Sequence, residues 1–203
     1  MRIACVSINH FSVQVETREK PDLAGKPLVI GGFPHEQKSV IDCSVETSGY
    51  HIRPSISLRQ AHHLCPEAIF LPLNEELYHK AFEEILGILD EFSPAVEASY
   101  HGKAFMDISG TERLFGPEEN LSKLMGQEIS EKTKLHPQIG IAASKFVAGV
   151  AAEMAAPPSW NTILIPMLPL LLGHCPIGLN PILWAHQQAH NAWIPSCAWG
   201  FRP

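Results

Sequence analysis

The sequence predicts an α+β fold in which helices pack on a mixed β-sheet. Strand-like apolar runs alternate with helical patterns over residues 1–155, and two consecutive strands form a hairpin in the middle of that stretch. Hydrophobic residues make up 45% of the 203 positions and charged residues 18%, which is typical of a folded globular protein. This composition excludes disorder along the whole chain, collagen and coiled coil.

Six short apolar runs, several of them rich in Val and Ile, predict the strands. They cover residues 2–8, 26–30, 68–71, 96–100, 103–108 and 138–142. Gly31-Gly32 ends the second strand, and because neither a helix nor a Gly-Lys-Ser/Thr triplet follows, it predicts a turn rather than a phosphate-binding loop. His101-Gly102 is the predicted turn of the central hairpin.

Four helices are expected between these strands. The first covers residues 57–64 and ends before Pro66, and the fourth covers residues 144–155. Asn74 is expected to cap the second, and Pro117 to occupy the first position of the third. The predicted core-facing side chains are Leu77, Ala81, Ile85, Ile88, Leu89 and Phe92, then Leu121, Leu124 and Ile129, then Phe146, Val147, Val150 and Met154.

The charge and the apolar segments restrict the class of protein. Fifteen basic and 21 acidic side chains give a net charge of −6, which disfavours tight DNA binding by this chain alone. The apolar start is too short for a signal peptide. The longest apolar stretch, residues 163–172, is interrupted by two prolines and is shorter than the roughly 20 residues of a membrane span. A cytoplasmic location without membrane association is therefore expected.

The five cysteines are scattered and include no CxxC pair, which fits a reducing compartment. Cys5 and Cys43 are interpreted as small buried hydrophobic residues. Cys65 lies close to His62-His63, but adjacent helical side chains point about 100° apart and do not face one metal ion. The two histidines are therefore expected on a solvated helix face.

Residues 156–203 differ in composition from the rest of the chain. They hold a single charged residue, Arg202, with eight of the 17 prolines and all four tryptophans. Such a segment is poorly suited to regular helices or to a solvated surface. It is either a Pro-rich, poorly ordered tail or the translation of a shifted reading frame, and we favour the second interpretation.

Five segments in register resemble the Y-family (DinB/UmuC-like) DNA polymerases. They are residues 5–16, which read CVSINHFSVQVE, then 25–30, 61–72, 104–109, which read AFMDIS, and 139–155. The resemblance covers about the first 155 residues, in the same order and with similar spacing. It implies a palm domain over residues 1–155 with a small fingers insertion at approximately 20–75, without the family's thumb and little-finger domains.

The resemblance implies a catalytic site in which three carboxylates hold two divalent ions, usually Mg²⁺. At the position of the first carboxylate this chain has Ser7. The Asp-Glu pair of the central hairpin falls on Gly102-Lys103 when counted back from Asp107. Counted forward from the preceding strand, it falls on His101-Gly102. Because neither register holds a carboxylate, we predict no catalytic residue, no metal ligand and no cofactor.

The family's nucleotide-binding positions are also altered. The Tyr and Arg that contact the triphosphate in the family correspond to Val45 and Ser48. The bulky residue that excludes ribose corresponds to Ser12. Lys145 matches a phosphate-contacting lysine, although a lysine at the start of a helix is equally well explained as a solvated side chain. Among these positions, Lys145 is the one that keeps the residue type of the family, and it is the one predicted nucleotide-binding residue.

Together these residues predict a pseudoenzyme of translesion DNA synthesis and DNA repair, similar to the ImuB-like members of the family. It would contact an active polymerase or other repair proteins and bind primer–template weakly. One alternative is residual metal-dependent nucleotidyltransferase activity that uses His10 and His101 with a displaced acid. Glu97 and Asp107 are the candidate acids. The other alternative is the non-functional product of a truncated gene.

Overall fold

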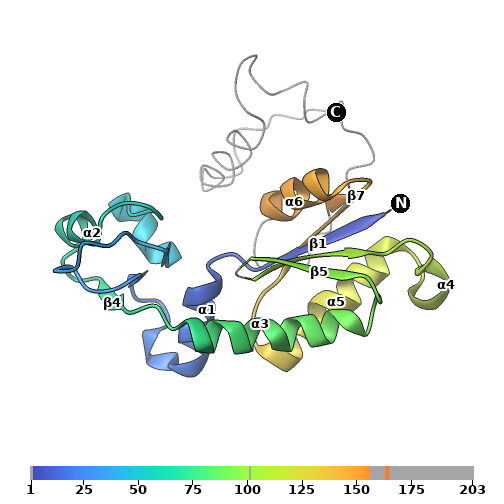
Figure 1. Cartoon of the computed structure of the whole chain (residues 1–203), viewed down its shortest axis with the longest axis horizontal. Helices are drawn as coiled ribbons and strands as arrows, with labels where there is room; N and C mark the ends of the chain where they lie inside the picture. The colour runs from blue at the N-terminus through green and yellow to red at the C-terminus, as the bar shows by residue number, and fades with distance from the viewer. Residues whose placement is uncertain (1, 101, 156–162, 165–203) are drawn as a thin grey trace, which may run out of the picture.

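The computed structural model describes residues 2–100, 102–155 and 163–164, and it confirms the α+β fold (Figure 1). The strands are β1 (Ile3–Ser7), β2 (Leu28–Ile30), β3 (Asp42–Cys43), β4 (Ile69–Leu71), β5 (Val96–Tyr100), β6 (Lys103–Asp107), β7 (Gln138–Ala142) and β8 (Ile163–Leu164). The helices are α1 (Phe11–Glu19), α2 (Leu58–Leu64), α3 (Glu75–Asp90), α4 (Glu112–Phe115), α5 (Glu118–Thr133) and α6 (Lys145–Met154), with 3₁₀ helices η1 (Pro21–Leu23) and η2 (Val45–Tyr50).

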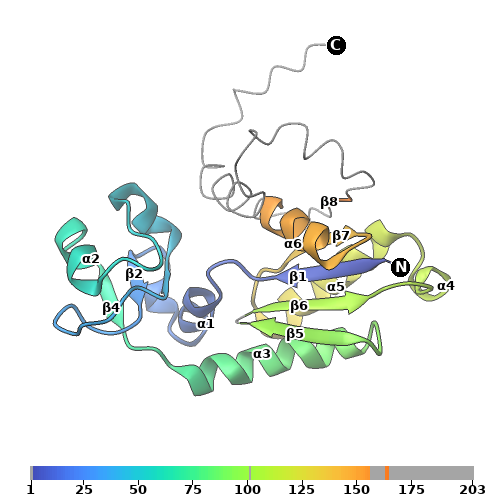
Figure 2. The same cartoon turned by 45° about the horizontal axis from the view of Figure 1, so that its top comes forward.

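The larger sheet has five strands in the order β5-β6-β1-β7-β8, so that β1 is central. β1 is antiparallel to both β6 and β7, whereas β8 is parallel to β7. Helices α3 and α5 cover one face and α6 covers the other, as Figure 2 shows. Since side chains alternate between faces along a strand, Val6 packs with α3 and α5, and Cys5 packs with α6.

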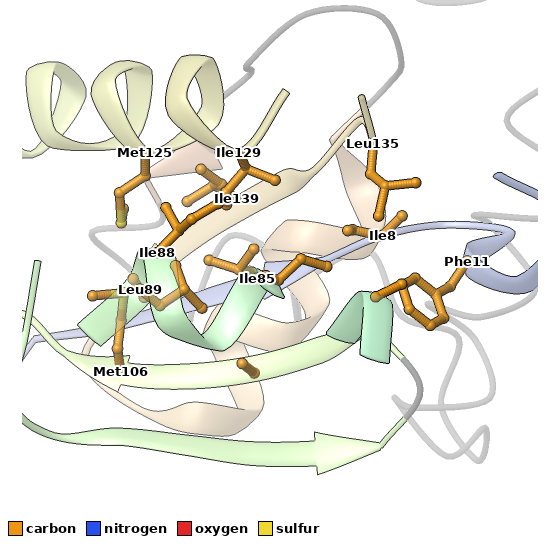
Figure 3. Close-up of a cluster of buried hydrophobic side chains, with 14 of the residues drawn as sticks. Ile8, Phe11, Ile85, Ile88, Leu89, Met106, Met125, Ile129, Leu135 and Ile139 are labelled. Carbon is orange, nitrogen blue, oxygen red and sulfur yellow. The ribbon is translucent and has the colours of Figure 1, made fainter. Parts of the chain in front are cut away.

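The main core lies between the larger sheet and helices α3 and α5 (Figure 3). As predicted, Asn74 caps α3: its side-chain oxygen accepts a hydrogen bond from the Leu77 N–H at 3.2 Å. Of the side chains predicted to face the core from α3, Leu77 is partly buried and the others are buried. The α3 prediction is therefore confirmed from its cap to its buried face.

Several side chains of α5 and α6 were placed wrongly by the sequence pattern. Phe146 and Met154 of α6 are 45% and 40% exposed, and Leu124 of α5 is exposed while its neighbour Met125 is buried. On α6 the small residues face the sheet instead: Ala148, Ala151 and Ala152 are fully buried. Large side chains do not fit there, because this helix packs directly on the strand backbone. Pro117 also differs from its expected position: its ψ of 154° is not helical, so it precedes α5 as the N-cap.

Helix α1 was not predicted. Its sequence contains Val13 and Val15, whose β-branched side chains favour strands, and it follows β1 without a conventional side-chain cap. Tertiary packing compensates for these unfavourable local features. The ring of Phe11 contacts the ring of Phe82 on α3 edge to face, with centroids 6.1 Å apart.

The smaller sheet has the order β3-β2-β4 and forms a smaller unit that is connected to the larger sheet through α1 and the start of α3 (Figure 2). It packs against the larger unit, because Leu28 and Ile30 of β2 belong to the main buried core. Its core contains Cys43 and Cys65, both buried as free thiols, and α2 covers it. His62 and His63 are exposed on α2, as predicted. Gly31 has φ 145°, and a Cβ there would lie 2.6 Å from the Ser39 carbonyl oxygen, so this position requires glycine.

Two residues of the compositionally unusual segment 156–203 form strand β8, which pairs with β7 through Gly140 and Ile141. The other residues of that segment lie outside the described part of the structure. Among the described residues, no helix has both the length and the apolar character that a membrane span requires.

Candidate functional site

The candidate site is one row of side chains across three strands of the larger sheet. Ser7 is the last residue of β1, and it pairs with Lys103 on β6 and with Gln138 on β7. Ser7 lies two residues after Cys5, so the row faces α6. Ser7 is 8% exposed, Gln138 4% and the Lys103 side chain 12%. The structure therefore brings together two of the predicted positions, Ser7 and Lys103, as direct cross-strand neighbours.

An acidic residue from α6 completes this row. The Lys103 ammonium nitrogen lies 2.9 Å from a carboxylate oxygen of Glu153, and the lysine side chain runs past Gly149, one helical turn earlier. The pair leaves the row close to neutral. Burial raises the pKa of the adjacent Cys5 thiol to about 12, which Lys103 partly offsets, so Cys5 is a protonated thiol at neutral pH. Sequence reasoning missed Glu153, because a single acid on a helix carries no motif.

Gly102 occupies a position that excludes a side chain. Its φ is 77°, and a Cβ there would lie 2.7 Å from the ring of Phe11. Its carbonyl oxygen accepts a hydrogen bond from the Ile8 N–H at 3.0 Å, which ties the hairpin to the end of β1. The pairing of β5 with β6 shifts its register at a bulge between Ala98 and Tyr100, which is why the two ways of counting across this hairpin differ by one residue. His101, the other candidate in this turn, lies outside the described residues.

The residues that the resemblance assigns to nucleotide binding come from three separate elements. Ser12 is buried in the first turn of α1. Val45 and Ser48 are exposed on η2 of the smaller unit. Lys145 begins α6, and its ammonium forms an ion pair with Glu97 of β5 across the sheet. Lys145 therefore already has a carboxylate partner, and the assignment of these residues to nucleotide contacts stays a prediction.

The alternative metal site around His10 is not formed by the described residues. Asp107 pairs with Ile3 at the far end of β6, four residues or about 13 Å from Lys103. Hydrogen bonds from Ser109 lower the pKa of Asp107, which fits a structural role. The imidazole of His10 instead lies 3.4 Å from Asp42. Within residues 2–100, 102–155 and 163–164, no group of three or more His, Cys, Asp or Glu side chains is placed to hold a metal ion.

A model of the impB/mucB/samB family matches residues 6–153. The DNA polymerase IV of Dehalococcoides mccartyi is 34% identical over 156 residues, which make up 77% of this chain and 40% of the relative. The DNA polymerase IV of Clostridium perfringens is 30% identical over 162 residues, or 80% of this chain and 45% of the relative. This chain therefore spans less than half the length of these two relatives.

Solved structures of DNA polymerases also resemble this chain. The insertion ternary complex of Dbh DNA polymerase superposes with a TM-score of 0.69 at 26% identity, covering 77% of this chain and 47% of that one. DinB from Sulfolobus solfataricus superposes with a TM-score of 0.75, covering 95% of this chain and 57% of that one. At 23% identity, this second likeness supports the fold alone.

These relatives correct one prediction from the sequence. The expectation of no cofactor is wrong, because the relatives are DNA polymerases, whose reaction uses divalent metal ions, usually Mg²⁺. The side chains at the expected ligand positions nevertheless do not fit such ions: Ser7 offers a hydroxyl, Gly102 no side chain and Lys103 an ammonium.

The family model matches the chain from β1 through α6. The sequence identity with polymerases and the superposition on a solved polymerase structure point to the same family. The chain belongs to the impB/mucB/samB family, the family of Y-family DNA polymerases.

Proposed function

We propose that this chain takes part in translesion DNA synthesis as a palm and fingers unit that does not itself transfer nucleotides. The observation that carries the proposal is the row in which Ser7 faces Lys103, with Lys103 paired to Glu153. Residues 1–155 would form the unit, with the fingers at approximately 20–75. The chemistry would come from an active polymerase, as in the ImuB-like members that the sequence resembles.

The charge of the row supports this proposal. Nucleotidyl transfer requires negative side chains that hold divalent ions against the primer hydroxyl and the phosphates. A lysine ammonium at one of those positions opposes a cation: a unit charge about 4 Å away contributes on the order of 4 kcal/mol at an effective dielectric near 20. Glu153 already neutralises this ammonium and so contributes no spare negative charge.

Weak DNA binding is expected for the same chain. It is net acidic, at −6, and this negative charge opposes the approach of the DNA phosphates. We expect a dissociation constant of about 1–100 µM for primer–template at physiological salt, in the range of non-specific binding. Fluorescence anisotropy at 150 mM salt measures it, and nanomolar affinity would contradict the accessory role as stated.

Primer extension tests the proposal directly. The full chain with primer–template, deoxynucleotides and either Mg²⁺ or Mn²⁺ should add no nucleotide above background, because the row lacks ligand carboxylates. A DNA polymerase IV relative serves as the positive control. Extension by this chain that disappears in the Ser7→Ala or Lys103→Ala variant would establish transferase activity and overturn the proposal. Adding the chain to the active relative should change the yield of lesion bypass, and an unchanged yield would count against an accessory role.

A further inference from the structure

Asp42 connects the smaller sheet to α1 through one carboxylate. One of its oxygens accepts a hydrogen bond from the backbone N–H of Ser12, in the first turn of α1, at 3.1 Å. The other lies 3.4 Å from Nδ1 of His10 and also accepts the Cys43 N–H at 2.8 Å. Asp42 belongs to β3, so two of these three contacts cross from one structural unit to the other.

Helix α1 depends on this carboxylate because it lacks a cap of its own. The N-terminal N–H groups of a helix have no partners within the helix and attract negative charge. His10, the residue before α1, has φ 52° and its side chain forms no capping hydrogen bond. Asp42 supplies the missing acceptor from a position 30 residues further along the chain. The junction between the two units therefore supplies the acceptor for one N–H group at the start of α1.

We propose that Asp42 is a latch that holds the smaller sheet against α1, and that the charge of His10 sets the strength of the latch. With His10 protonated, its imidazolium and the Ser12 N–H hold one carboxylate from two sides. With His10 neutral, the ion pair is lost and the carboxylate keeps only uncharged donors. The orientation of the fingers unit would then be most tightly fixed under mildly acidic conditions, whatever the catalytic state of the palm.

The direction of the pH dependence follows from the charges around His10. The hydrogen bond with Asp42 raises the pKa of His10 above its ordinary value, although burial opposes this. The described acids that act on it are Asp42 of β3 and Glu46 of η2, and the backbone of Cys43 adds to the effect. Against α3, the contact of α1 beside His10 is the uncharged ring pair of Phe11 and Phe82. The stabilisation is therefore complete below the ordinary pKa of about 6.5 and is lost as the pH rises through the folded-state pKa.

The test uses the full chain and two NMR readouts: titration of the His10 ring, and exchange of the Ser12 amide hydrogen. In the parent protein, Ser12 should be better protected at pH 5.5 than at pH 8, after correction for intrinsic exchange. In the Asp42→Asn variant, the pKa of His10 should fall towards its ordinary value. Protection of Ser12 at pH 5.5 should fall about tenfold, as expected when a hydrogen bond to a charged acceptor is replaced by one to a neutral acceptor. Asparagine keeps an oxygen that can accept from Ser12, so this variant isolates the charge.

Two controls make the result specific. His10→Asn should remove the pH dependence of Ser12 protection while leaving the Asp42 contact, and asparagine tolerates the left-handed backbone at this position. Glu83→Gln removes a carboxylate 3.4 Å from His79 on the exposed surface of α3 and should leave Ser12 unchanged. An unchanged His10 titration in Asp42→Asn, or Ser12 protection that does not depend on pH in the parent, would overturn the latch.

Discussion

Gly140→Ala should destabilise the folded chain by about 3 kcal/mol or more. A Cβ at this position would lie 2.3 Å from the carbonyl oxygen of Ala148 and 2.3 Å from the nitrogen of Ala152. Both atoms belong to the backbone of α6, so no side-chain rotation relieves the overlap. Helix α6 would have to move away from β7, and the buried alanines between them would lose their contacts.

Urea unfolding followed by circular dichroism measures this loss, and a matched substitution controls for it. Gly87 is exposed within α3, and a Cβ there meets no atom within 4 Å. Gly87→Ala should therefore stabilise the chain by about 0.5–1 kcal/mol, the usual gain when alanine replaces a helical glycine. Equal effects of the two substitutions would show that α6 does not pack on β7 as closely as described.

Local signals predicted the parts of the fold that local interactions determine. Asn74 and the spacing of Ile85 and Leu89 predicted α3, because the cap and the apolar stripe lie within a few turns of one another. The same reasoning failed for α1, where Val13 and Val15 suggest extended chain. There the decisive contacts come from elsewhere in the sequence, and no pattern within nine residues reveals them.

At the candidate site, too, some residues were predicted from the sequence and others were not. The resemblance identified Ser7 and Lys103, and the strand register places them opposite each other. The acids that complete the neighbourhood were not predicted: Glu153 lies 50 residues from Lys103 in the chain, and Asp42 lies 30 residues from Ser12. Single acids on a helix or a short strand carry no spacing signal, so only the tertiary structure assigns them partners.

Adding carboxylates to the row should strengthen its binding of divalent ions. The combined variant Ser7→Asp with Lys103→Glu places carboxylates at two facing positions, beside the existing Glu153. The side-chain oxygen of Gln138 on the same row is buried and has no hydrogen-bond partner among the described residues, so it can add a neutral ligand. Oxygen ligands of this kind are those that Mg²⁺ and Mn²⁺ prefer. Gly102 should stay unchanged, because a side chain there would overlap Phe11.

Without divalent ions the variant should be less stable than the parent, by about 4 kcal/mol for each pair of carboxylates held some 4 Å apart. Adding Mg²⁺ or Mn²⁺ should restore much of the lost thermal midpoint, which differential scanning fluorimetry with and without chelator measures. Ser7→Asn with Lys103→Gln keeps similar shapes without charge and should show no ion-dependent shift. Primer extension should stay near background, since Val45 and Ser48 would still occupy the positions that are predicted to contact the triphosphate. A thermal midpoint that does not respond to either ion would show that Ser7, Lys103 and Glu153 do not converge as the register implies.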